Sequence, residues 1–218
     1  MRKPLMNGAR DGGLQRVRRA VSGAGSEVEL EYAAIPREYR ERGTLDAGER
    51  VILLAERLRD YEAGVYRCPE AQIAATVREV MRARSKTELL IAPDVSSTWL
   101  PDDFSFRADA GFSYAELDRS QGVLTGCALA IAVTGTIVLR HDVAEGRRAL
   151  TLIPDYHLCV VFANQAVETV PEGIREMAKF GSAPITTISG PSATADIEMT
   201  RVKGVHGPRV LDVILVDR

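Results

Sequence analysis

The stretch HLCVVFA, residues 157–163, is apolar at almost every position, so a strand formed from it would bury both of its faces. The run RVLDVILV at residues 209–216 has a similar character. Strands that are apolar on both faces are typical of a sheet covered by helices on each side. These two segments therefore predict an α/β fold.

Working outward from these segments, strand-like and helical patterns alternate along the chain. The spacing of the middle strands is short, which indicates some antiparallel pairing. We therefore predict a three-layer α/β domain with a mixed central sheet. The further strand-like runs are 88–93, 104–110, 123–133, 136–141, 149–154 and 184–189, and the helical segments are 12–22, a helix from the N-cap Asp46 to Gly64, 69–84, 113–119, 171–180 and 194–200.

The first 45 residues differ from the rest. Leu14, Val17 and Val21 lie on one face of a short helix, and a connection rich in glycine and charge follows. This pattern predicts an N-terminal helix and linker over 1–45 and an α/β domain over 46–218. The first 20 residues are basic, which fits either a solvated helix or a docking arm for an acidic partner.

Composition excludes several classes of protein. A net charge of −2 gives no whole-chain argument for a nucleic-acid or membrane partner. No apolar run approaches the roughly 20 residues of a membrane span, and no secretory signal follows the basic start, so we expect a cytoplasmic protein. The three cysteines form no CxxC pair and the three histidines are widely spaced, so we expect no metal site and no iron–sulfur cluster in this chain.

The segment ITTISGPSATADIEMT, residues 185–200, reads as a strand, a turn and a helix. Ser189 ends the strand, Gly190 lies in the turn, and Ser192 is placed to cap a helix that begins near residue 193. The free N–H groups of such a helix start, with the hydroxyls of Ser189, Ser192 and Thr194, suit a phosphate or carboxylate at the sheet edge where ligands usually bind. Two ordinary turns remain the alternative.

Acidic and basic candidates follow in the same part of the chain. Asp196 and Glu198 resemble an acid pair, but two residues on a helix point about 200° apart, so they would not face one ligand together. His206 lies between Gly204 and Gly207, where it would serve as an acid, a base or an anion donor near neutral pH, or as a plain loop residue.

A third turn, Thr134–Gly135–Thr136, interrupts a long apolar run. Glycine at this place permits either a bulge or a close approach of the backbone to a ligand. The two hydroxyls add further contacts for an anion.

The segments TGTIVL, RALTLIPDYHLCVV, ISGPSATADIE and GVHGPRVLDVILVD, in this order, resemble the LUD-domain family in its lactate-utilisation protein C type. The resemblance covers residues 85–218. It implies a fold like that of the NagB/RpiA/CoA-transferase group. It also implies a role with iron–sulfur partner proteins in the oxidation of L-lactate to pyruvate, while the cofactor of this chain stays unknown.

One position departs from the family pattern. The family usually has Ala-Glu-Thr-Gly-Thr, and Val133 stands here at the glutamate position, so any chemistry of that glutamate is lost or altered. The candidate catalytic residues are His206, Asp196 and Glu198. The candidate ligand-binding residues are Thr134, Gly135, Thr136, Ser189, Gly190, Ser192, Thr194, Gly204, Gly207 and Arg209.

Two other functions stay open at this point. The chain is alternatively a stand-alone enzyme, similar to cyclo-ligases or CoA-transferases, that binds a nucleotide, CoA or a phosphorylated small molecule with His206 as acid or base. It is alternatively a non-catalytic interaction protein that docks through its basic N-terminal helix.

Overall fold

The computed structural model describes residues 8–21, 26–36, 38–141, 145–194, 202–203 and 207–217. Its contacts divide the chain into two compact units, residues 1–39 and residues 40–218. The first unit contains the helices α1 (Gly8–Val21) and α2 (Ser26–Ala34). The sequence predicted the first of these helices, but α2 forms where only a linker was expected. Its sequence, SEVELEYAA, is free of the glycines that suggested a linker on either side.

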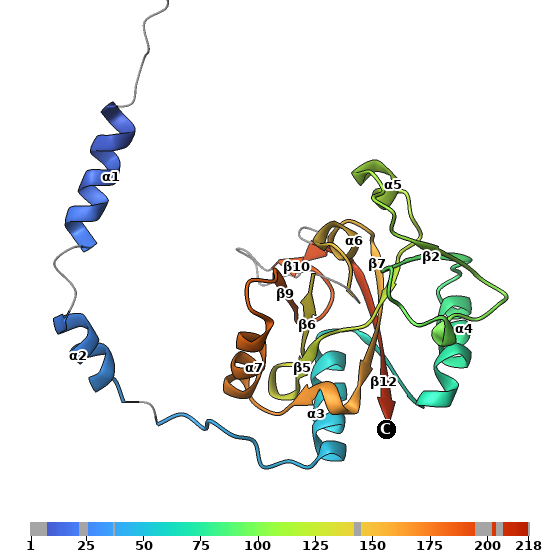
Figure 1. The fold of residues 1–218 in the computed structure, drawn as a ribbon. Coiled ribbons are helices and arrows are strands. Elements are labelled where there is room, and N and C mark those ends of the chain that lie inside the picture. Colours follow the sequence, from blue (N-terminus) through green and yellow to red (C-terminus); the bar gives the residue numbers. More distant parts are fainter. Residues whose placement is uncertain are drawn as a thin grey trace, which may run out of the picture. The chain divides into compact units, whose positions relative to one another are not determined.

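The second unit is built on a six-stranded sheet with the order β1-β12-β7-β4-β2-β3. Every neighbouring pair in this sheet is parallel. The arrangement confirms the α/β class, and Figure 1 shows helices on both sides of the sheet. Its strands are β1 (Gly64–Pro69), β2 (Glu88–Ile91), β3 (Ser105–Ala108), β4 (Val123–Thr125), β7 (Tyr156–Phe162) and β12 (Val210–Asp217).

The antiparallel pairing indicated by the sequence lies in a second, four-stranded sheet with the order β8-β5-β6-β9. The long apolar run 123–133 is divided between the sheets, because β4 belongs to the first and β5 to the second. A short hairpin, β10 with β11, completes the strands that the structure describes. The bounds are β5 (Leu129–Ile131), β6 (Thr136–Arg140), β8 (Ala166–Val167), β9 (Ile185–Ile188), β10 (Ala193–Thr194) and β11 (Val202–Lys203).

Both faces of the parallel sheet are buried, as the apolar character of 157–163 predicted. Cys159 and Val161 of β7 pack with helix α3 (Ala47–Asp60) in one core cluster, and Leu158 and Val160 pack with helix α4 (Ile73–Ala83) in another. Alternate side chains of a strand point to opposite faces, so one continuous apolar run supplies both clusters. Asp46 caps α3 as predicted, by accepting a hydrogen bond of 2.8 Å from the Glu49 N–H.

The remaining helices are short. Three-residue 3-10 turns link several strands to the elements that follow them. The helices are α5 (Tyr114–Asp118), α6 (Arg148–Leu152) and α7 (Val170–Met177), and the 3-10 turns are η1 (Glu70–Gln72), η2 (Ser97–Trp99), η3 (Ala132–Thr134), η4 (Ala163–Gln165) and η5 (Ala178–Phe180).

Three sequence-based assignments were wrong. Residues 149–154 were expected to form a strand, but α6 occupies this place and buries Leu150 in a small core cluster. Residues 64–69 form β1, although the sequence suggested only a helix end and a connection. The helix expected over 194–200 does not begin at Thr194, because this residue pairs in β10, and residues 195–200 lie outside the described part. Short apolar runs fit either conformation, and packing decides between them.

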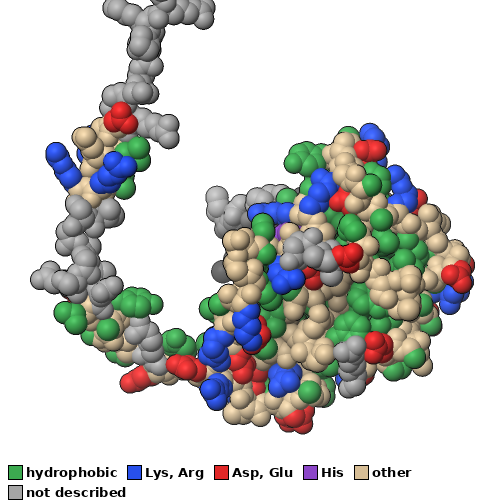
Figure 2. Space-filling model, viewed as in Figure 1, with side chains coloured by type: hydrophobic (Ala, Val, Ile, Leu, Met, Phe, Trp, Pro, Cys, Tyr) green, Lys and Arg blue, Asp and Glu red, His purple; other side chains and the backbone are tan. Residues whose placement is uncertain are grey.

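The surface carries charges of both signs. Figure 2 shows basic and acidic side chains interspersed over the visible face of the second unit. Among the described residues, no helix combines the length and the apolar character that crossing a membrane requires.

Candidate functional site

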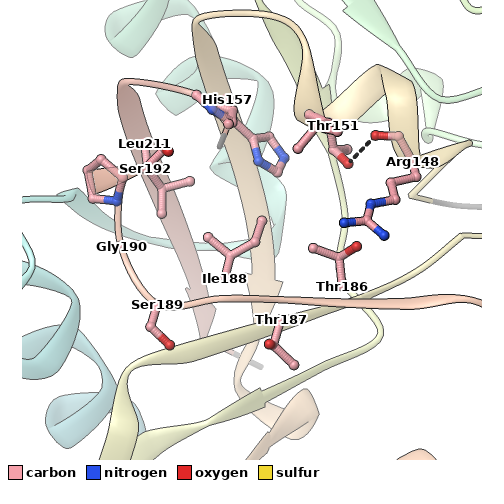
Figure 3. A pocket seen from close by; sticks show the side chains of 14 residues that line it. Arg148, Thr151, His157, Thr186, Thr187, Ile188, Ser189, Gly190, Ser192 and Leu211 are labelled. Carbon is pink, nitrogen blue, oxygen red and sulfur yellow. Dashed lines mark hydrogen bonds between the residues drawn. The ribbon is translucent and has the colours of Figure 1, made fainter. Parts of the chain in front are cut away.

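A cavity of about 240 Å³ lies beside the first residues of β7 and β12. Its walls come from α6, from residues 186–192 and from residues 207–208, and His157 and Leu211 also line it. Figure 3 shows the side chains of Arg148, Thr186 and His157 directed toward one shared space. The cavity is thus formed by segments that are far apart in the sequence.

The two turns of the segment 185–209 come together at this cavity. The Ser192 N–H donates a hydrogen bond of 2.8 Å to the Pro208 carbonyl, which joins the turn after β9 to the turn before β12. Of the candidate ligand-binding residues, Ser189, Gly190, Ser192 and Gly207 line the cavity. The two turns therefore form one wall of the cavity.

The predicted physical basis for anion binding at this wall was wrong in two respects. Residues 193–194, after Ser192, form a strand paired with 202–203, so no helix start offers its free N–H groups at Ala193. The cavity also lies at the amino ends of the parallel strands, because His157 and Leu211 are second residues of their strands. The general rule for open α/β sheets had indicated the carboxyl ends.

The turn Thr134–Gly135–Thr136 reaches the cavity indirectly. The Thr136 hydroxyl is 2.8 Å from the Thr134 hydroxyl and 2.8 Å from the Ser189 hydroxyl, so a chain of three hydroxyls leads from the turn to the cavity wall. Gly135 has a left-handed backbone with φ of 58°, and a Cβ there would lie 2.8 Å from Arg57 Cβ. The left-handed backbone and the close packing on α3 thus both require glycine at this position.

Val133, which stands at the position where the resemblance led us to expect glutamate, packs with an apolar cluster between the second sheet and α7. It is not one of the residues that line the cavity. Arg209 is also outside the lining; it is exposed and lies 3.5 Å from the Asp155 carboxylate. The candidates Asp196, Glu198, Gly204 and His206, and the side chain of Thr194, lie outside the described part of the structure.

The structure adds cavity residues that the sequence analysis did not select. These residues lie in α6, β7 and β9, where the sequence suggested ordinary strands. Three of them belong to the segment RALTLIPDYHLCVV, which resembles the LUD-domain family. The added polar residues are Arg148, Thr151, His157, Thr186 and Thr187.

His157 is fully buried, and its proton is located by its neighbours. The Thr125 hydroxyl donates to the Gly126 carbonyl at 2.8 Å, so the same oxygen accepts from His157 Nε2 at 2.8 Å. Nε2 therefore carries the hydrogen, and Nδ1 is an acceptor. No described residue donates to Nδ1. Burial lowers the pKa of His157 to about 4, so the ring is neutral at pH 7.

A second histidine orients a hydroxyl of the cavity wall. His141 Nδ1 lies 3.0 Å from the Gly146 carbonyl, which only accepts, so Nδ1 donates. In the neutral ring, Nε2 then accepts from the Thr186 hydroxyl at 2.7 Å. The Thr186 oxygen is left with its lone pairs for any ligand that enters.

Arg148 supplies positive charge at the cavity. It is exposed, and none of the described carboxylates forms an ion pair with it. Its neighbour Arg147 is different, because it binds the Asp109 carboxylate at 2.6 and 3.2 Å and also donates to the Phe112 carbonyl. Two adjacent arginines thus have separate roles: Arg147 ties two loops together, and Arg148 is available to an anion.

The described residues offer no group of three or more His, Cys, Asp or Glu side chains that could hold a metal ion. The polar side chains that line the cavity offer hydrogen bonding and charge. They combine one cation, several hydroxyls and one buried acceptor.

Comparison with known proteins identifies relatives of this chain. It is 39% identical over 206 residues to the "Lactate utilization protein C" of Deinococcus radiodurans, and the match covers 93% of each protein. It is 35% identical over 115 residues to the protein of the same name from Shouchella clausii, but it matches only 44% of that protein's length.

A solved structure is also similar. The crystal structure of a DUF162 family protein from Deinococcus radiodurans matches 79% of this chain and 99% of its own, with 35% sequence identity and a TM-score of 0.69. The family model of the LUD domain matches residues 51–216, which include the whole cavity. This chain belongs to the LUD-domain family.

Proposed function

We propose that this chain is a subunit of a lactate-utilisation system and supports the oxidation of L-lactate to pyruvate together with iron–sulfur partner proteins. The observation that carries the proposal is the 39% identity to a lactate utilization protein C over 93% of both chains. At this identity and coverage, the two proteins share their fold.

The state of the cysteines supports a division of labour with partner proteins. All three cysteines are buried and free. The neighbouring Cys159 thiol and burial raise the pKa of Cys127 well above its ordinary value, and burial raises that of Cys68. Iron–sulfur clusters are bound by thiolates, which these surroundings disfavour. Clusters that carry electrons from lactate are therefore proposed for the partners.

The size of the cavity favours a small carboxylate over a nucleotide or CoA. Pockets for drug-sized ligands have volumes of about 300–1,000 Å³, and this cavity has about 240 Å³. A stand-alone nucleotide- or CoA-dependent enzyme is thus less well supported than a protein that handles lactate or pyruvate.

The test is growth of a strain in which the gene for this chain is deleted. We expect the strain to grow normally on pyruvate and poorly on L-lactate, and a plasmid copy of the gene should restore growth on L-lactate. Affinity purification of the tagged chain from lactate-grown cells should recover cysteine-rich iron–sulfur proteins. Normal growth of the deletion strain on L-lactate would overturn the proposal.

A further inference from the structure

We infer that the cavity binds a small 2-hydroxycarboxylate, with the carboxylate paired to Arg148 and the hydroxyl donating a hydrogen bond to Nδ1 of His157. The inference concerns a binding site and no chemical step. It rests on the proposed function only in its choice of L-lactate as the first probe.

The acceptor at the cavity floor is the first argument. His157 Nδ1 is buried and receives no hydrogen bond from any described residue. A buried polar atom without a partner costs about 1–3 kcal/mol. A ligand that brings a hydroxyl to this atom removes that cost, whereas a ligand with only a carbonyl or a methyl group at this place does not.

The protonation state of His157 determines which ligand groups Nδ1 can bind. The hydrogen bond to Thr125 places the ring hydrogen on Nε2, and burial keeps the ring neutral at pH 7. Nδ1 therefore accepts and does not donate. A hydroxyl donates, but the keto oxygen of a 2-oxo acid only accepts, so the floor distinguishes an alcohol from its ketone.

The positive charge of Arg148, in the cavity wall, is the second argument. The guanidinium of Arg148 is directed toward the same space as the His157 ring (Figure 3), and no described carboxylate neutralises it. Guanidinium groups bind carboxylates through two parallel hydrogen bonds. In a 2-hydroxycarboxylate the carboxylate and the hydroxyl are on adjacent carbons, which matches one cation and one acceptor in a cavity of about 240 Å³.

Two further hydroxyl side chains line the cavity. Thr187 and Ser189 come from β9 and the turn after it, and both line the cavity. Ser189 is held by its hydrogen bond of 2.8 Å with Thr136. The Ser189 hydrogen is used in this bond, because Thr134 donates to the Ile131 carbonyl and Thr136 donates to Thr134. Figure 3 shows the Thr187 and Ser189 side chains on the side of β9 away from His157, so the proposed ligand contacts do not include them. Since a water-sized probe does not reach the His157 ring, a ligand hydroxyl contacts Nδ1 only after a small shift of the side chains that line the cavity.

The test measures binding to the full-length chain by isothermal titration calorimetry with four probes. These are L-lactate, pyruvate, propionate and glycerol 3-phosphate. We expect L-lactate to bind at least tenfold more tightly than pyruvate, which lacks the donor, and propionate, which lacks the hydroxyl. Arg148→Gln should weaken L-lactate binding at least tenfold. Arg82→Gln makes the same change of charge on α4, outside the cavity, and should leave binding unchanged.

A second measurement tests His157 without a mutation that risks the fold. In the chain labelled with ¹⁵N-histidine, L-lactate should shift the Nδ1 resonance of His157 toward that of a hydrogen-bonded nitrogen, and pyruvate should leave it in place. Equal affinities for L-lactate and propionate, an unaltered affinity in Arg148→Gln, or an unmoved Nδ1 resonance would contradict the inference. Tighter binding of glycerol 3-phosphate than of L-lactate would also contradict the inference, because it would show that the site prefers a phosphate to a carboxylate.

The binding test and the growth test of the proposed function can fail independently. A chain that restores growth on L-lactate but binds none of the probes contradicts this inference alone. A chain that binds L-lactate as expected but is dispensable for growth on it contradicts the proposed function alone.

Discussion

Tyr156 and His157 are neighbours on β7, but their side chains lie on opposite faces of the parallel sheet. The polar groups around the two side chains differ. The Tyr156 hydroxyl donates to the Asp212 carboxylate at 2.9 Å, and Arg84 donates to both oxygens of that carboxylate at 2.7 Å. On the other face, His157 has one nitrogen bonded to Thr125 and one without a partner among the described residues.

The Asp212 cluster, formed by Arg84, Tyr156 and Asp212, is closed. Gly64 leaves room for it, since a Cβ at residue 64 would lie 2.0 Å from Asp212 Oδ1. Burial and the Asp212 charge raise the pKa of Tyr156, and the hydrogen bond to Asp212 raises that of Arg84, so both protons are held firmly. A satisfied buried cluster of this kind stabilises the fold, whereas a buried acceptor left open beside a cavity is suited to a ligand.

The largest expected effect comes from opening the closed cluster. Asp212→Ala leaves the Tyr156 hydroxyl buried without an acceptor and removes the partner of Arg84, so we expect a loss of about 3–5 kcal/mol in the free energy of unfolding. Urea denaturation measures this loss. Asp103→Ala removes an exposed carboxylate that pairs with two arginines of α4, and should cost far less. Similar losses in the two variants would show that the Asp212 cluster is not structural.

The next effect concerns His157, which lies beside the cavity, and it depends on pH. His157 has a folded-state pKa of about 4, below its ordinary value of 6.5. Its contribution to stability is thus fully present above pH 6.5 and is lost as the pH falls toward 4, because the unfolded state takes up the proton first. Relative to the non-titrating variant His157→Gln, the wild type should lose about 3 kcal/mol between pH 7 and pH 4. Parallel stability curves for the two proteins would contradict the burial of a neutral ring.

A smaller effect tests the position of the ring hydrogen. Thr125→Val keeps the shape of the side chain but removes the hydroxyl that accepts from His157 Nε2, so we expect a loss of about 1–3 kcal/mol in the free energy of unfolding. Nitrogen NMR of labelled histidine should also show a larger share of the tautomer with hydrogen on Nδ1. A spectrum identical to that of the wild type would refute the assignment of the hydrogen to Nε2.

The smallest effect distinguishes two arginines. Arg148→Gln removes a side chain that has no carboxylate partner among the described residues, so its effect on the unfolding free energy should be within about 0.5 kcal/mol. Arg84→Gln breaks the bonds to Asp212 and should cost more than about 1 kcal/mol. Thermal and urea unfolding of both variants provide the comparison. Equal losses in the free energy of unfolding would contradict the distinction between the satisfied Asp212 cluster and the unpaired Arg148 at the cavity.

Much of the fold could be predicted from local patterns. The apolar runs of β7 and β12, the capped start of α3 and the strands β2, β3, β6 and β9 were all recognised. The failures share a cause. Residues 149–154 and the run 123–133 are apolar in a way that fits several structures, and contacts with distant elements decide which one forms.

The candidate site was predicted in part. The two turns of 185–209 do meet at one cavity, and Thr136 does contact Ser189. The helix expected after Ser192 was wrong at its start, because pairing between β10 and β11 replaces the cap that the local sequence favoured. His157 and Arg148 were not selected, since an apolar strand and a short amphipathic run give no local sign that one carries an unpaired acceptor and the other a free cation.

The sequence by itself determined the α/β class, the burial of both sheet faces and the glycine-rich turns, because these follow from side-chain periodicity and backbone freedom over a few residues. Only the tertiary structure decided that Tyr156 closes a cluster while His157 leaves an acceptor open, and that Arg148 joins that acceptor at one cavity. The physical reason is that satisfaction of a buried polar atom depends on partners from other elements: Thr125 for one ring nitrogen of His157, and no described residue for the other.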